Sequence, residues 1–76
     1  MATVTVRMVH VNNEEEISRA QVNDDNTVTY SQDDDILPSL FDNVNKKYPN
    51  LDLFGVAKLL NKDGWSNGYI MIARGG

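Results

Sequence analysis

The sequence predicts a small α+β domain with the order ββαββ, in which one amphipathic helix packs on a small sheet. Three observations predict it: an N-terminal stretch of alternating β-branched residues, an apolar stripe at helical spacing, and a C-terminal apolar run of strand length. The chain has 76 residues, of which 41% are hydrophobic and 24% charged, which is the composition of a globular domain. We therefore expect a single domain over residues 1–76.

The first two strands are predicted to form a hairpin. Residues 3–11 alternate, so that Val4, Val6 and Met8 fall on one face of the predicted strand. Asn12 and Asn13 tolerate turn geometry, and residues 15–22 then return antiparallel. After a turn over residues 23–26, residues 27–30 indicate a short strand that continues or caps the sheet.

A helix is predicted at about residues 35–47. Its apolar stripe consists of Ile36, Leu37, Leu40, Phe41 and Val44. Carboxylates of Asp33, Asp34 and Asp35 favour the helix N-terminus, because they oppose the positive end of the helix dipole. Pro38 fits in the first turn, and Pro49 disfavours helical geometry in the residue before it, which ends the helix.

The stretch from residue 51 to residue 60 is too densely apolar to show a period, so both a helix and a buried strand fit it. We favour a strand at about Phe54–Leu60, because Gly55 weakens a helix. Asp63 and Gly64 then suggest a hairpin turn into a final strand within residues 69–73.

The charge is divided unevenly along the chain. The net charge is −4, and residues 1–45 hold nine acidic side chains against two basic ones. An acidic surface repels nucleic acid and attracts basic protein surfaces, so we expect a cationic protein partner and no direct nucleic acid binding. The candidate contact carboxylates are Glu14, Glu15, Glu16, Asp24, Asp25, Asp33, Asp34 and Asp35. The alternative is that these carboxylates are solvated turns and helix caps.

No motif for catalysis or for a cofactor is found. His10 is the only histidine and there is no cysteine, so neither a transition-metal site nor a thiol nucleophile is predicted. The aspartate clusters lack the alternating spacing of a calcium-binding loop, and the glycines form no phosphate-binding pattern. We therefore predict a protein that is not an enzyme and uses no cofactor or metal.

Trp65 and Tyr69 are candidate contact residues near the last predicted turn. Trp65 stands between Gly64 and Ser66, where a large aromatic side chain is either folded back onto the core or presented as an interface anchor. Tyr69 would join it in one contact patch. The apolar runs are too short to cross a bilayer and the N-terminus lacks the pattern of a signal peptide, so we expect a cytoplasmic protein without membrane contact.

The predicted order resembles the β-grasp fold of ubiquitin and of the prokaryotic sulfur carriers. The resemblance is carried by residues 53–60 running into Asp63-Gly64, and by the end of the chain, residues 70–76, which closes in Arg74-Gly75-Gly76. It implies that an activating enzyme adenylates the Gly76 carboxylate, which is then transferred to a thiol and a lysine or converted to a thiocarboxylate. Gly75 and Gly76 would be the functional residues and Arg74 a recognition handle.

Three functions follow as hypotheses. The first is a ubiquitin-like modifier or carrier that acts through the C-terminal diglycine. The second is an acidic inhibitor of the kind that phages encode against host machinery, whose carboxylates mimic phosphates and occupy a basic, nucleic-acid-binding cleft of a host protein. The third is a protein that forms a homodimer through an exposed strand edge, either the first or the last strand.

Overall fold

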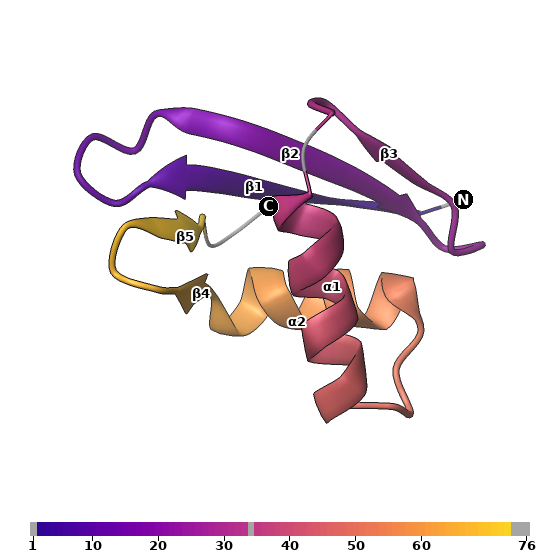
Figure 1. Cartoon of the computed structure of the whole chain (residues 1–76). Coiled ribbons are helices and arrows are strands. Elements are labelled where there is room, and N and C mark those ends of the chain that lie inside the picture. Colours follow the sequence, from indigo (N-terminus) through magenta and orange to yellow (C-terminus); the bar gives the residue numbers. More distant parts are fainter. Residues whose placement is uncertain (1, 34, 74–76) are drawn as a thin grey trace.

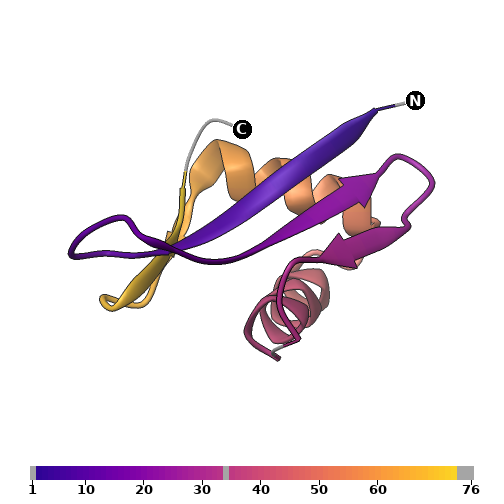
Figure 2. The same ribbon diagram turned by 90° about the horizontal axis from the view of Figure 1, so that it is seen from above.

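The computed structural model describes residues 2–33 and 35–73, which form a sheet with both helices on one side of it (Figures 1 and 2). The elements in chain order are β1 (Thr3–His10), β2 (Glu16–Asn23), β3 (Val28–Tyr30), α1 (Ile36–Lys47), α2 (Leu53–Asp63), β4 (Trp65–Ser66) and β5 (Ile70–Ile72). The sheet is antiparallel throughout, with the strand order β3-β2-β1-β5-β4. The predicted dimer edge at the first or last strand is therefore wrong, because β1 and β5 both lie between two other strands. The predicted α+β class is confirmed, with a second helix that the predicted order lacks.

The β1–β2 hairpin forms the centre of the molecule. Its register sets Val6 opposite Ala20 and Val4 opposite Val22, and a bulge follows Met8. These inward side chains meet both helices in a single apolar core. The fully or nearly buried members of this core are Val6, Met8, Ala20, Val22, Leu37, Leu40, Phe41, Val56, Ala57, Leu60 and Ile72. The predicted boundaries of the first three strands agree with the structure to within one residue at almost every end.

Helix α1 begins and ends almost where the sequence predicts. Leu37, Leu40 and Phe41 are buried, and Lys46 and Lys47 occupy the last turn, at the negative end of the helix dipole. The predicted role of the aspartates at the N-terminus is not seen at Asp35, whose side chain makes no capping hydrogen bond. The Asp35 carbonyl accepts the Ser39 amide at 3.0 Å, which is the first backbone hydrogen bond of the helix.

The predicted strand at Phe54–Leu60 is wrong, because these residues belong to α2. The side chain of Asp52 caps this helix by accepting the amide of Gly55 at 2.8 Å, so the glycine lies in the first turn, where it satisfies the cap. Val56, Ala57 and Leu60 recur at helical spacing and are buried. As a helix, this densely apolar segment turns its buried side chains to one side, where they pack against the sheet and α1.

The far end of α2 explains the second error in this region. Gly64 ends the helix with φ 74° and ψ 178°, a combination that is almost restricted to glycine, and its amide donates to the Leu60 carbonyl. Asp63-Gly64 is therefore a helix end and not the predicted hairpin turn. On the side of the sheet, Asn61 donates from its side-chain amide to the Thr5 carbonyl at 2.8 Å, which fixes α2 against β1.

The Asp52 cap yields a first prediction. We expect Asp52→Ala to lower the free energy of unfolding by about 1 kcal/mol, because the Gly55 amide loses its acceptor. Asp52→Asn is the matched control, since an asparagine caps a helix about as well and should keep most of that stability. Chemical denaturation of the three proteins measures the difference. Equal losses in both variants would show that the carboxylate acts by charge and not as a cap.

Candidate protein-binding surface

The tip of the β1–β2 hairpin and the tip of the β4–β5 hairpin lie side by side at one end of the molecule (Figure 1). Pairing of β1 with β5 sets His10 opposite Ile70, and one residue further the amide of Val11 donates to the Tyr69 carbonyl at 3.0 Å. Two turns that are far apart in the sequence are thereby joined by a backbone hydrogen bond. The structure thus brings predicted contact residues from both halves of the chain to one place.

Tyr69 is the most exposed large apolar side chain in the described part of the chain, with 82% of its surface accessible. The turn that carries it is well fixed: the side-chain oxygen of Asn67 accepts the amides of Tyr69 and Ile70 at 2.9 and 3.0 Å. Gly68 allows the turn through its positive φ of 95°. An aromatic ring is therefore held out from the protein on an ordered turn.

Val11 lies beside Tyr69 and is 36% exposed, and the sequence analysis did not single it out. The sequence pattern predicts Val11 within the first strand, whereas β1 ends at His10. The signal that could have found it is its place immediately before Asn12 and Asn13, where an apolar residue begins a turn.

Glu14 and Glu15 complete this end of the molecule. Glu14 has a positive φ of 57°, and its amide donates to the His10 carbonyl at 2.9 Å, so the turn has a defined shape. The carbonyl of Glu15 accepts the His10 amide at 3.0 Å, and both glutamate side chains are exposed. We call the four residues Val11, Glu14, Glu15 and Tyr69 the hairpin-tip surface.

Glu16 is not part of the hairpin-tip surface, because its carboxylate pairs with two arginine side chains. Its carboxylate lies 2.9 Å from Arg7 and 3.4 Å from Arg19, on the face of the sheet that carries no helix. The three side chains partly neutralise one another there. Of the three consecutive glutamates predicted as one acidic group, only Glu14 and Glu15 therefore belong to the hairpin-tip surface.

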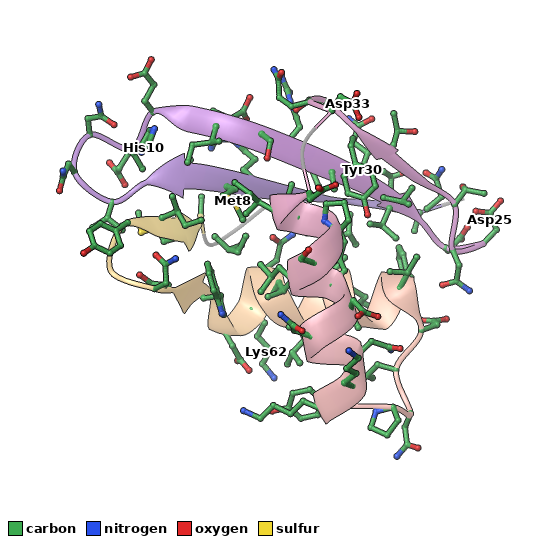
Figure 3. The ribbon with its side chains drawn as sticks, in the orientation of Figure 1. Met8, His10, Asp25, Tyr30, Asp33 and Lys62 are labelled. Atoms are coloured by element: carbon green, nitrogen blue, oxygen red, sulfur yellow. The ribbon has the colours of Figure 1, made fainter. Side chains whose placement is uncertain are left out.

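Asp24 and Asp25 lie at the other end of the β1–β2 hairpin, as the labelled positions of His10 and Asp25 show (Figure 3). Eight strand residues separate the two ends by about 26 Å. Asp24 accepts the Ala2 amide at 3.1 Å, and Asp25 accepts the Thr27 hydroxyl at 2.6 Å and the Thr27 amide at 3.0 Å. These carboxylates thus shape a turn, which was the alternative considered for them.

The bonds from Thr27 hold the pKa of the Asp25 carboxyl below its ordinary value of 3.8, the hydroxyl contributing most. A lowered pKa means that the folded protein favours the charged carboxylate. The stability it contributes is present above the ordinary pKa and is lost as the pH falls through the folded-state pKa. Asp25 therefore stabilises the turn at neutral pH.

The remaining acidic candidates lie elsewhere. Asp33 and Asp35 are exposed in the connection between β3 and α1, and Asp34 is outside the described residues. The acidic residues that were predicted to act together are accordingly divided among the hairpin tips, the β2–β3 turn and the start of α1. No common acidic face joins them in the part of the chain that is described.

Trp65 does not share a patch with Tyr69. Trp65 lies in β4 and pairs with Ile72 of β5. Its side chain is half-buried and packs against the core. Trp65 also lines two hollows along α1, and Asn43 lines both of them as well. Of the two predicted alternatives for Trp65, its contact with the core agrees with the one in which the side chain folds back onto the core. Arg74, Gly75 and Gly76, the predicted conjugation tail, lie outside the described residues.

Other kinds of site find little support in residues 2–33 and 35–73. No three histidine, aspartate or glutamate side chains gather there in a way that could hold a metal ion. Neither α1 nor α2 is long and apolar enough to cross a membrane. The comparisons with known protein families, with curated proteins and with solved structures give no match to this chain.

The Asp25 turn yields a prediction about proton binding. Thr27→Val removes the hydroxyl donor and keeps the backbone amide, so we expect the pKa of Asp25 to rise part of the way back to 3.8. A carboxyl-detected NMR titration measures this pKa directly. Thr29→Val, on the exposed side of β3, is the control that should leave it in place. An unchanged Asp25 pKa in Thr27→Val would contradict the assigned cause.

Proposed function

We propose that this protein acts by binding a basic surface of another protein, without catalysis, and that the hairpin-tip surface makes the contact. The observation that carries the proposal is the exposure of Tyr69, 82% of whose surface is accessible on an ordered turn that adjoins, through Val11, the turn that carries Glu14 and Glu15. The partner we infer has a shallow apolar pocket for the tyrosine ring with lysine or arginine side chains around it.

Two physical arguments support the choice of this surface. Tyrosine is enriched among residues that dominate binding energy, because its ring offers a large contact area and loses little conformational freedom. The turn beneath Tyr69 is already ordered by the Asn67 side chain, so binding would spend little free energy on fixing it. The surrounding carboxylates would steer a basic partner toward the ring.

The proposal narrows the hypothesis of an acidic inhibitor of a nucleic-acid-binding host protein. A partner cleft that took up all the candidate carboxylates would have to span the whole length of the β1–β2 hairpin, about 26 Å. Glu16 is engaged with Arg7 and Arg19, and Asp25 with Thr27. A contact centred on the hairpin tips needs only Glu14 and Glu15, whose side chains are exposed; Glu15 accepts a hydrogen bond of 3.4 Å from the side-chain amide of its neighbour Asn13.

The test compares proteins captured from a lysate of the source cells by wild-type and variant baits. We expect Tyr69→Ala to weaken capture of a basic partner by about tenfold or more, as loss of a central aromatic anchor does. Tyr69→Phe should retain most binding, since it keeps the ring. The double variant Glu14→Gln/Glu15→Gln should weaken binding mainly at low ionic strength, because exposed charges are screened by salt.

Asp42→Asn is the matched charge control, because Asp42 is exposed on α1 and pairs with Lys46 away from the hairpin tips. It should bind as the wild type does. Capture that is equal for wild type and Tyr69→Ala, or a partner with an acidic surface, would refute the proposal.

A second candidate is a ubiquitin-like modifier or carrier of β-grasp type that acts through Gly75 and Gly76. The amide of Ala73 donates to the Arg7 carbonyl at 2.9 Å, so only three residues of the sequence follow a residue held by the sheet, and this short tail counts against its reaching into an activating enzyme. The leading hairpin and the following helix agree with the β-grasp resemblance. Helix α2, in place of the predicted strand, departs from it.

This candidate predicts covalent adducts. An N-terminally tagged chain expressed in the source cells and recovered under denaturing conditions should carry a protein linked through the carboxyl of Gly76, detected by mass spectrometry. A chain without Gly75 and Gly76 should carry none and should unfold at the same denaturant concentration. If the full chain carries no such linkage and its partner is lost in denaturant, the modifier hypothesis is refuted and the proposal of non-covalent binding remains.

A further inference from the structure

One flank of α1 carries an apolar strip that no element of the described chain covers completely. Ile36 and Tyr48 are each 43% exposed, although both are large apolar residues. They lie at opposite ends of the helix, and between them, at a spacing of four residues, lie Leu40, which is nearly buried in the core, and Val44, which is half-buried. Two adjoining hollows, of about 340 and 350 Å³, run along this flank between α1 and Trp65.

We call this feature the α1 groove: α1 forms one wall with the strip just described, and Trp65 and Leu59 belong to the opposite wall. In Figure 1, α1 stands in front of α2, and the end of α2 leads into β4, the strand that carries Trp65. None of the four residues of the hairpin-tip surface lines the α1 groove, although Glu14 and Trp65 both line a third hollow.

The charges along the α1 groove differ between its two ends. Asp35 lines the hollow at the start of α1, and Lys47 lines the hollow at its end. Within residues 2–33 and 35–73 neither of them takes part in an ion pair. Asp63 of α2 also lines the hollow at the Lys47 end, but it has an interaction of its own within the chain.

We propose that the α1 groove binds a second copy of this chain, with the two α1 helices antiparallel about a two-fold axis. In a two-fold contact the same surface meets itself. Where the two-fold axis is perpendicular to α1, each end of one helix faces the opposite end of the other. Asp35 of each copy then lies near Lys47 of the other, and the apolar strips face each other between them. The parallel arrangement would set like charges together, which is unfavourable.

The expected dimer is weak. Stable interfaces bury about 800 Å² on each partner, and a helix of 12 residues is only about 18 Å long. A contact made by α1 and Trp65 is therefore smaller than a standard interface. We expect a dissociation constant in the micromolar range and a monomer at low concentration.

Sedimentation velocity of the full chain over a wide range of concentration tests this. The sedimentation coefficient of the wild type should rise with concentration from that of a monomer toward that of a dimer. Ile36→Asp, at an exposed position that should tolerate a polar residue in the monomer, should shift the midpoint to at least about tenfold higher concentration. Circular dichroism confirms that each variant is folded.

Charge reversal identifies the antiparallel arrangement. Lys47→Glu alone should weaken the dimer by about tenfold, because it faces Asp35 of the other copy, and adding Asp35→Lys should restore the dissociation constant to within about threefold. Lys58→Glu, an exposed reversal on α2 outside both hollows, is the control and should dimerise as the wild type does. A monomer at every concentration, or a double variant that fails to recover, overturns the proposal. Neither result bears on the hairpin tips.

Discussion

The rest of the structure depends on the pairing of β1 with β2 and on the burial of one face of that hairpin. Val6 and Ala20 face each other in the register, and neither side chain is accessible to solvent. A two-stranded hairpin is marginal in water unless its apolar face is covered. Both helices cover this face, and β3 and β5 extend the pair on its two sides. With no cysteine in the chain, this one apolar core supplies the stability.

The same pairing determines where contact residues lie. β5 pairs with the end of β1, which places the β4–β5 turn next to the β1–β2 turn. Tyr69 therefore lies near Glu14 and Glu15, while the β2–β3 turn with Asp25 is at the far end of the hairpin. The charge pattern in the sequence, with most acidic residues in the first 45, describes a linear distribution. The register of the strands converts it into three separate groups.

Two surfaces of different character result. The hairpin tips offer an exposed aromatic ring among carboxylates, and the α1 groove offers an apolar strip with opposite charges at its ends. We propose a basic protein as the partner of the first surface and a second copy of the chain as the partner of the second. Because they share no residue, a dimer formed through the α1 groove would leave both copies of the hairpin-tip surface outside the contact, and it would present two binding surfaces to a partner.

The sequence by itself determined the α+β class, the hairpin, α1 and the last strand, because these segments have a clear apolar period or a turn residue at each end. Residues 53–60 are apolar at nearly every position, so local preference could not separate a strand from a helix. The capping signals, Asp52 before the segment and Gly64 after it, were present in the sequence and indicate a helix. Among the candidate site residues, the sequence identified Tyr69 and, separately, the acidic group that includes Glu14 and Glu15, but not that the two lie at one end of the molecule. Only the tertiary structure decided that, because the β1–β5 pairing joins turns more than 50 residues apart, and a contact at that separation leaves no periodic signal in the chain.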